Sequence, residues 1–335
     1  MSALVESPLQ LLCAVEAHAA GIAGRRTRVL ARQGVPTLTA AVDAFRDLGL
    51  PDGLDVVVTR PRPAPEDDVH LVGDPFSGTF QAALARGAAG GRLVLVDDGL
   101  ATLDLARRLL AGDPLVRPTA HHGPLRRGLG AVTTRRLRRL ARDGRLTVWT
   151  MLPLDRGLTD GLRALGVDVR EHSFDWLASR DRGSGPADVL EEPTVVVGSA
   201  LAADHLVDVE HYVAWVRGIA ADGPVRYLPH RRHHPLVTAL LAQIPGVGVT
   251  MPGAPVEVRL RNLRGPRRVI TLPSTAAITL TRLLSPRGVA VVPHDVPDDW
   301  WTARADPALR NHLGAATALA RSAARRTRRP QPATT

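Results

Sequence analysis

A cluster of histidines and arginines offers the clearest chemistry in the sequence. Residues 225–235 read V-R-Y-L-P-H-R-R-H-H-P, where a short β-type run ends at Pro229 and a helical run follows the cluster. Titratable side chains between a strand and a helix lie where open α/β sheets bind ligands. Arg231 and Arg232 are suited to bind an anion, and a histidine is suited to donate a proton. The alternative is a solvated basic loop or a surface histidine cluster that binds metal.

Two adjacent carboxylates follow another predicted strand, at Asp97 and Asp98. Adjacent carboxylates disfavour each other's ionisation, which raises the pKa of one of them and makes it a usable general base. Gly99 permits the sharp turn that would direct them into a cleft. The alternative is a helix N-cap beside a solvated aspartate. Gly73 and Asp74 close a further strand in the same half of the chain.

Polar groups also follow strands in the second half. Ser274 and Thr275 lie directly before a predicted helix, where hydroxyls and free backbone N–H groups form a site suited to phosphate. The alternative is an ordinary serine cap. Glu257, at the start of another helix, is placed to accept hydrogen bonds from sugar hydroxyls, or it interacts only with the helix dipole. Gly198 and Ser199 close the first strand of this half.

The elements that must position these residues alternate between strand and helix. The predicted strands are 3–5, 27–31, 54–59, 69–73, 92–96, 146–150, 194–197, 225–228, 247–250, 268–272 and 288–292. The predicted helices include one that begins at Ser7-Pro8, followed by 37–48, 78–86, 101–111, 209–219, 236–244, 256–263, 276–284 and 299–325. This alternation predicts βαβ units and parallel sheets, hence an α/β fold.

The composition of residues 180–186, R-D-R-G-S-G-P, predicts a linker. We therefore expect two Rossmann-like domains with parallel sheets that face a central cleft. Residues 1–182 would form the N-terminal domain, with the paired carboxylates, and residues 187–325 the C-terminal domain, with the phosphate-binding groups, followed by a disordered tail over 326–335. Carboxylates in the first half and phosphate-binding groups in the second suit a transferase whose base and donor site come from different domains.

Charge and cysteine content narrow the class of protein. All 43 basic residues are arginine and the net charge is +10, which favours polyanionic partners, although abundant Arg, Ala, Gly and Pro also suit a GC-rich coding sequence. The single cysteine, Cys13, excludes an internal disulfide and fits a reducing compartment. Without a long apolar run or a signal-peptide pattern, we expect a cytoplasmic protein. The arginine-rich residues 117–145 predict a solvated helix and loop, or a surface for an acidic acceptor or the inner face of a membrane.

The ordered motifs resemble those of the bacterial sialyltransferases and polysialyltransferases that use CMP-activated sugars. These families share a D/E-D/E-G triplet, a His-Pro pair and a Ser-Ser or Ser-Thr pair. The counterparts here are the triplet 97–99, the segment that starts at His230 with His234-Pro235 beside it, and the pair 274–275. The S-P-L-Q run at 7–10 and the P-V-E run at 255–257 also resemble family segments. Arg231 follows His230 where the family has proline, whereas a literal His-Pro pair occurs at His234-Pro235. We favour His230 because it lies at the strand end, and His234 is the alternative.

The resemblance implies a GT-B architecture and a metal-independent, inverting transfer of a nonulosonic sugar in cell-surface polysaccharide biosynthesis. Asp97 or Asp98 would deprotonate a hydroxyl of a glycan or glycolipid acceptor. His230 would protonate or hydrogen-bond the departing CMP phosphate. The donor-binding set would be Gly198, Ser199, His230, Arg231, His234, Glu257, Ser274 and Thr275, with Glu257 at the cytidine ribose and no cofactor or metal.

Three other interpretations stay open. The same fold could use another nucleotide sugar. An arginine-rich protein could bind polyanions without catalysis, although its few aromatics are not interleaved with arginines as in nucleic-acid binders. A metal could bind at His230, His233 and His234, although no cysteine or acidic ligand lies nearby at a metal-site spacing.

Overall fold

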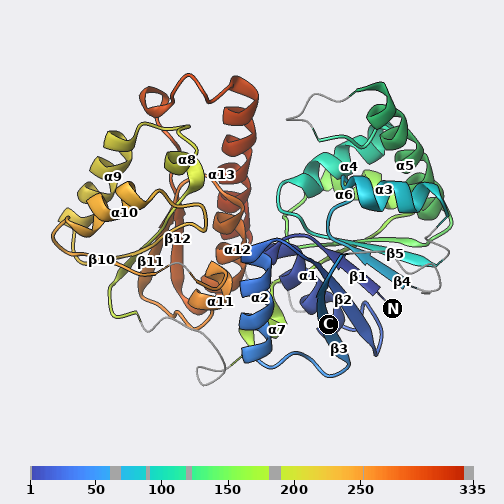
Figure 1. Ribbon diagram of the computed structural model, residues 1–335, viewed down its shortest axis with the longest axis horizontal. Coiled ribbons are helices and arrows are strands. Elements are labelled where there is room, and N and C mark those ends of the chain that lie inside the picture. Colours follow the sequence, from blue (N-terminus) through green and yellow to red (C-terminus); the bar gives the residue numbers. More distant parts are fainter. Residues whose placement is uncertain are drawn as a thin grey trace. The chain divides into compact units, whose positions relative to one another are not determined.

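The computed structural model describes residues 2–60, 69–87, 91–117, 123–180, 190–251 and 253–327. The chain divides into two compact units, Met1–Gly185 and Pro186–Thr335. Each unit is built around one parallel sheet (Figure 1). Most of the predicted linker, and residues 328–335 of the predicted tail, lie outside the described residues.

Unit 1 contains a seven-stranded sheet of order β3-β2-β1-β4-β5-β6-β7. Its strands are β1 Ser2–Val5, β2 Thr27–Arg32, β3 Leu54–Thr59, β4 Val69–Val72, β5 Arg92–Val96, β6 Leu146–Thr150 and β7 Asp168–Glu171. Strands such as β5 read as apolar runs because helices cover both faces of a parallel sheet. The direction of strand addition reverses between β1 and β4, which is where such sheets bind ligands.

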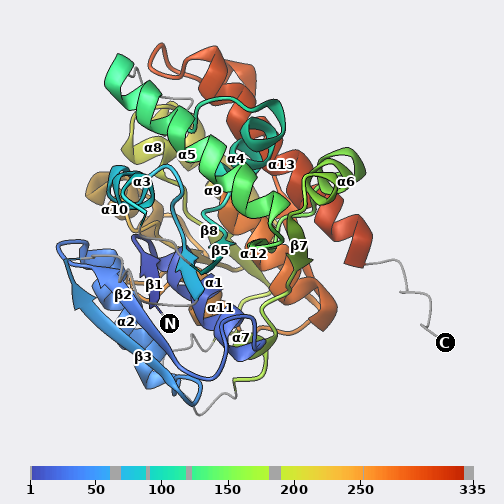
Figure 2. The same ribbon diagram turned by 90° about the vertical axis from the view of Figure 1, so that its right-hand side faces the viewer.

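The helices of unit 1 lie in two layers (Figures 1 and 2). One layer contains α1 Pro8–Ala19, α2 Pro36–Asp47 and α7 Asp175–Ala178, and the other contains α3 Gly78–Ala85, α4 Ala101–Ala111, α5 Pro124–Arg142 and α6 Arg156–Ala164. The predicted start of α1 is confirmed. Pro8 is its first residue, and the Ser7 hydroxyl accepts a hydrogen bond from the Gln10 backbone N–H at 3.3 Å.

The arginines of α5 are only partly solvated, which corrects the expectation for this segment. Arg136 donates to the carbonyl oxygens of Leu84 at 2.6 Å and Ala85 at 3.0 Å, at the end of α3. Arg138 likewise donates to the last carbonyls of α4, at 3.3 and 3.4 Å. The final carbonyls of a helix have no partner within the helix, so these side chains supply the missing donors.

Unit 2 contains a five-stranded sheet of order β10-β9-β8-β11-β12, which reverses between β8 and β11. Its strands are β8 Thr194–Val197, β9 Val225–Leu228, β10 Val247–Val249, β11 Arg267–Thr271 and β12 Val289–Pro293. Its helices are α8 Ala200–Ala203, α9 Val209–Ala221, α10 Pro235–Ala242, α11 Val256–Leu260, α12 Thr275–Leu284 and α13 Pro307–Thr327, with short 3₁₀ turns at Ser285–Arg287 and Asp298–Trp300.

Further sequence expectations differ from the structure. The last helix does not begin near residue 299, because Pro307 is its first residue and the Asp306 carboxylate accepts from the Leu309 backbone N–H at 2.8 Å. Strand β7 and helices α6, α7 and α8 were not predicted. Helix α13 continues to Thr327, so residues 326 and 327 of the predicted disordered tail are helical. Within the described residues, no helix combines the length and the apolar character needed to cross a bilayer.

Candidate functional site

The two aspartates of the triplet have different environments at the end of β5. Asp97 is fully buried, with 0% of its surface exposed. Its Oδ1 accepts from the Thr150 hydroxyl at 2.8 Å, and its Oδ2 accepts from the Met151 backbone N–H. Burial raises the pKa of Asp97 to about 6. These contacts tie the end of β5 to the end of β6, so Asp97 supports the sheet from inside.

Cys13 and His172 lie beside Asp97 in the core. His172 Nε2 is 3.9 Å from Asp97 Oδ2, and the His172 ring stacks on Trp149 with centroids 4.9 Å apart. Among the described residues, this trio is the one group of three metal-capable side chains whose ligand atoms lie within 4.8 Å of one another. The three histidines after β9 do not form such a group among those residues.

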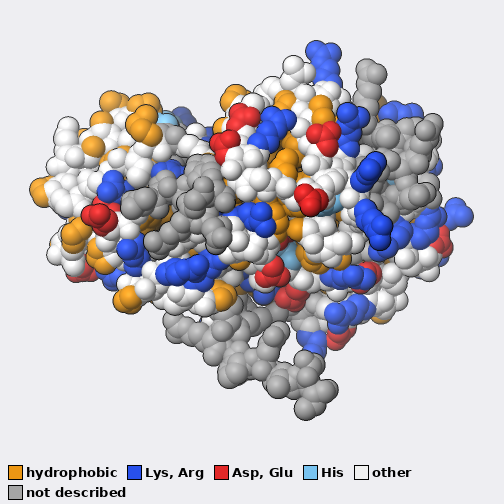
Figure 3. All heavy atoms as spheres, turned by 90° about the horizontal axis from the view of Figure 1, so that it is seen from below, with side chains coloured by type: hydrophobic (Ala, Val, Ile, Leu, Met, Phe, Trp, Pro, Cys, Tyr) orange, Lys and Arg blue, Asp and Glu red, His pale blue; other side chains and the backbone are white. Residues whose placement is uncertain are grey.

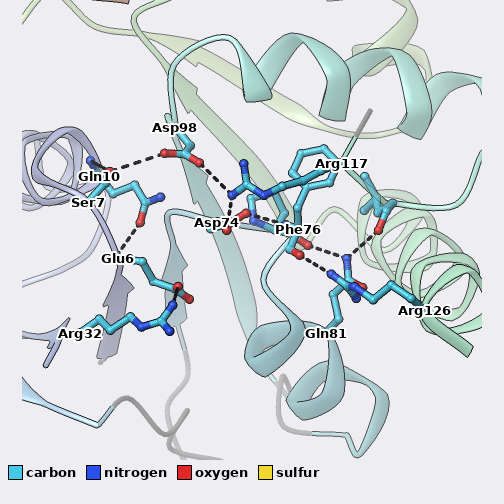
Figure 4. A network of polar contacts seen from close by, with 12 residues as sticks. Glu6, Ser7, Gln10, Arg32, Asp74, Phe76, Gln81, Asp98, Arg117 and Arg126 are labelled. Atoms are coloured by element: carbon cyan, nitrogen blue, oxygen red, sulfur yellow. Dashed lines mark hydrogen bonds and ion pairs between the residues drawn. The ribbon is translucent and has the colours of Figure 1, made fainter. Parts of the chain in front are cut away.

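Asp98 is the partly exposed member of the pair, with 18% of its side chain accessible. Ser7 Oγ donates to its Oδ1 at 3.5 Å (Figure 4), and the nearby Gln10 side chain lowers its pKa by polar interaction. The pKa of Asp98 is raised to about 6, chiefly by burial; the nearby Asp74 also raises it, whereas Gln10, Arg117 and Ser7 lower it. A carboxylate with such a pKa at the carboxyl edge of a sheet is suited to general-base chemistry.

Neither aspartate caps the following helix. The residue before α4 is Leu100, which makes no side-chain capping bond. Gly99 adopts a φ of +65°, a left-handed conformation that side chains disfavour, and this turn leads from β5 into α4. The interpretation of the triplet as an ordinary helix cap is therefore wrong.

Arg117 is a site residue that sequence reasoning missed. Its Nη2 lies 2.6 Å from Asp74 Oδ2 and 3.7 Å from Asp98 Oδ2, so one guanidinium links two carboxylates (Figure 4). Asp74 is itself buried, and its Oδ1 accepts from the Phe76 backbone N–H at 2.8 Å. In the sequence Asp74 is recognisable only as a residue at a strand end, because nothing local connects it to an arginine 43 positions away.

In unit 2, His230 lies directly beyond the end of β9. Its Nδ1 accepts from the Arg232 backbone N–H at 3.1 Å, which places the proton of the neutral ring on Nε2. Burial, together with the charges of Arg231 and Arg232, lowers the pKa of His230 to about 4. At neutral pH the side chain is therefore an uncharged hydrogen-bond donor through Nε2.

Gly198 allows the end of β8 to approach the His230 loop closely. A Cβ at this position would lie 2.8 Å from the His230 backbone nitrogen and 2.9 Å from the Leu228 carbonyl oxygen. Ser199 follows and caps α8 by accepting from the Leu201 backbone N–H at 3.2 Å. The structure thus brings the predicted residues 198 and 230 together, while the Ser199 hydroxyl has a structural partner.

Ser274 occupies the N-cap position of α12, but its side chain makes no capping hydrogen bond. It is half-buried and follows β11, the strand on the other side of β8 from β9. Thr275 is the first residue of α12, so the N–H groups at the start of that helix lie at this edge too. This arrangement matches an anion site better than an ordinary serine cap.

The remaining predicted donor-binding residues, Glu257, Arg231 and His234, differ in their surroundings. Glu257 accepts from the Thr279 hydroxyl at 2.6 Å, and burial raises its pKa while the charge of Arg231 lowers it. Arg231 is exposed. His234 precedes α10 without capping it, and its ring contacts that of His205 with centroids 5.9 Å apart. Of the two histidines considered, His230 is the one beside Gly198.

No family model matches the sequence, and no curated protein matches it. Among solved structures, a protein assigned as a UDP-N-acetylglucosamine 2-epimerase from Listeria monocytogenes aligns with a TM-score of 0.51 at 14% identity, over 87% of this chain and 78% of that one. LpCGTa, crystallised with UDP, aligns with a TM-score of 0.50 at 11% identity, over 97% and 93% of the two chains. The chain has a GT-B-like fold. At these identities the likeness extends to the fold alone.

Proposed function

We propose that this protein is a glycosyltransferase that moves a nonulosonic sugar from a CMP-sugar to a hydroxyl group of a glycan or glycolipid. The observation that carries the proposal is the contact of Asp98 with Ser7 and Gln10. Two motifs that resemble the sialyltransferase families, S-P-L-Q and the acidic triplet, therefore meet around one partly exposed carboxylate. The GT-B-like fold supports a nucleotide-sugar substrate.

Asp98 is the proposed general base. It takes the proton from the acceptor hydroxyl as that oxygen forms a bond to the anomeric carbon of the sugar. The bond from the anomeric carbon to the CMP phosphate oxygen breaks, and its electron pair leaves with the phosphate. Asp97, fully buried and bonded to Thr150 and Met151, holds the strand end from which Asp98 projects.

Unit 2 is the proposed donor site. The start of α12, with Ser274 and Thr275, would bind the phosphate, and His230 Nε2–H would donate to a phosphate oxygen. Negative charge grows on that phosphate as the sugar departs, so fixed donors there stabilise the transition state. Because the pKa of His230 is low, we propose hydrogen bonding rather than full proton transfer as its role. Glu257 would meet the cytidine ribose.

A nucleotide sugar with another nucleobase is the second candidate donor, because LpCGTa, one of the two similar structures, was crystallised with UDP. Polyanion binding without catalysis has less support. On the face of the molecule in Figure 3, arginines are interspersed with acidic side chains and do not form one continuous patch.

The proposal is tested by measuring how much nucleotide sugar the protein consumes in the presence of a metal chelator. Purified protein would receive a CMP-sialic acid, a UDP-sugar and a GDP-sugar together with a panel of sialylated and galactose-terminated glycans, and products would be weighed by mass spectrometry. We expect sugar additions, single or repeated, from the CMP donor alone, lost in Asp98→Asn and retained in the surface control Asp55→Asn. Transfer from the UDP or GDP donor would overturn the assignment of a CMP donor but would still support a glycosyltransferase. Transfer from none of the three donors, together with no binding of CMP, UDP or GDP in a separate titration, would overturn both.

A further inference from the structure

The outer face of α5 carries a row of exposed side chains that we call the α5 stripe: Leu125, Val132, Arg135, Arg139 and Arg142. Counted from Leu125, the others follow at 7, 10, 14 and 17 positions, a spacing that keeps them on one side of a helix. Leu125 is 91% exposed and Val132 is 36% exposed. The three arginines are also exposed. The stripe therefore has an apolar end and a cationic end.

The cationic end is not neutralised by the described part of unit 1. Helix α5 contains seven arginines and no acidic residue. Its inward arginines bind backbone carbonyls of α3 and α4, as described above. Among the described residues, Arg135 and Arg139 have no ion-pair partner, and Arg142 donates to the Arg138 carbonyl oxygen at 3.3 Å. Proximity to the negative end of the helix dipole accounts for arginines in the last turn, but it does not account for an exposed leucine at the other end.

The apolar end lies beside the candidate acceptor edge. Arg126, the neighbour of Leu125, donates to the Phe76 carbonyl oxygen and to Gln81 Oε1 (Figure 4). The Phe76 backbone N–H in turn donates to Asp74, which pairs with Arg117 next to Asp98. One chain of polar contacts thus leads from the start of α5 to the proposed base.

We propose that the α5 stripe docks on an anionic lipid bilayer. Leu125 and Val132 enter the interfacial region, and Arg135, Arg139 and Arg142 bind lipid phosphates. A soluble acidic glycan or nucleic acid would use the arginines but would gain nothing from an exposed leucine, so the apolar end favours lipid. Docking in this way brings the acceptor edge to the membrane surface, and the acceptor is then a lipid-carried glycan. This last step rests on the proposed function.

Vesicle flotation tests the docking without any substrate. The full chain would be mixed with phosphatidylcholine vesicles that contain phosphatidylglycerol, with pure phosphatidylcholine vesicles, and with dextran sulfate as a soluble polyanion. The variants are Leu125→Ser and the double variant Arg135→Gln/Arg139→Gln. The matched control is Arg25→Gln/Arg26→Gln, two exposed arginines that follow α1 in the other helix layer.

We expect the wild type to float with anionic vesicles and not with neutral ones, and to dissociate as salt is raised. The double variant should lower partitioning about tenfold or more, while the control variant should change it less than twofold. Leu125→Ser should weaken vesicle binding but leave dextran sulfate binding unchanged. All variants should keep the wild-type melting temperature, because the replaced side chains face solvent.

Several outcomes would overturn the proposal. Failure of the wild type to float would contradict it. Equal loss of binding in the control and in the stripe variant would show that net charge alone acts. A silent Leu125→Ser would replace the lipid surface with a general polyanion surface. Nucleotide binding, measured separately, decides the proposed function, so failure of one proposal is distinguishable from failure of the other.

Discussion

The hydroxyl of Ser7 donates to Oδ1 of Asp98 at 3.5 Å, although the two residues are 91 positions apart. Ser7 follows β1 and Asp98 follows β5, and β4 lies between these strands in the sheet. The same hydroxyl accepts from the backbone N–H of Gln10, whose side chain also contacts Asp98. The Ser7 hydroxyl therefore both caps α1 and holds the Asp98 carboxylate. This double role gives a physical reason for the two motifs to occur together.

The two aspartates should respond differently to substitution. Asp98→Asn should lower kcat by a factor of about 100 or more, because the acceptor hydroxyl loses its base. Asp97→Ala should lower the free energy of unfolding by about 2–3 kcal/mol, because the Thr150 hydroxyl and the Met151 N–H lose a buried acceptor. Steady-state transfer rates and urea unfolding measure the two effects. The account is wrong if Asp97→Ala is stable and inactive while Asp98→Asn stays active.

The pH dependence of transfer should follow the ionisation of Asp98. The base must be ionised to accept a proton, and burial raises its pKa to about 6, so kcat should fall as pH falls through about 6. Arg117→Gln removes a positive charge that lowers this pKa, so the acid limb should move to higher pH. Arg32→Gln is the control, since Arg32 pairs with Glu6 at 2.6 Å and not with Asp98. An acid limb that stays in place in Arg117→Gln would argue against Asp98 as the titrating group.

Much of this fold could be predicted from local patterns. Buried parallel strands such as β5 and β8 are continuous apolar runs, and a serine before proline marked the start of α1 correctly. Strand β7 was missed because it is an edge strand with the mostly polar sequence D-V-R-E, which carries no apolar run. The last helix begins at Pro307 rather than near residue 299, because Asp306 and Pro307 form its start, while Asp298–Trp300 form a separate 3₁₀ turn.

Glycine at position 198 should be required for the donor site. A Cβ in Gly198→Ala would overlap backbone atoms of Leu228 and His230, so we expect a loss of about 1–3 kcal/mol in unfolding free energy and weaker nucleotide binding. Gly218→Ala is the matched control, because Gly218 lies within α9 and nothing lies within 4 Å of its Cβ position. That change should leave binding intact and raise stability by about 0.5–1 kcal/mol. Thermal melts and nucleotide titrations of both variants compare them, and equal behaviour would contradict the close approach.

Donor binding should not depend on protonation of His230. The phosphate of a CMP-sugar carries two ester bonds and does not titrate near neutrality. A change of affinity with pH in this range would therefore come from the histidine and not from the phosphate. Since the pKa of His230 is about 4, affinity for a hydrolysis-resistant CMP-sugar analogue should stay constant between pH 6 and 8. His230→Ala should weaken binding about 10- to 100-fold, and His230→Gln, which keeps an N–H donor, should weaken it less. Affinity that falls steadily as pH rises through 6.5 would indicate a charged histidine instead.

The sequence could predict only those site residues that follow a strand closely. Residues directly after strands, such as Asp98, His230 and Ser274, lie at the carboxyl edges of the two sheets. The sequence could not tell Asp98 from Asp97, because their difference comes from Thr150, Met151 and Gln10, which are distant in the chain. It could not identify Arg117 for the same reason. The free Ser274 hydroxyl and the occupied Ser199 hydroxyl also look alike until their partners are seen.

Calorimetric titration of CMP, UDP and GDP into the wild type and His230→Ala, in the presence of a chelator, tests the central claim most directly. His233→Ala is the neighbouring control. The account predicts that CMP binds in preference to UDP and GDP, and that His230→Ala weakens this binding while His233→Ala does not. Preference for UDP or GDP would contradict the CMP donor, and CMP binding that is indifferent to His230 would contradict the placement of the phosphate beside β9.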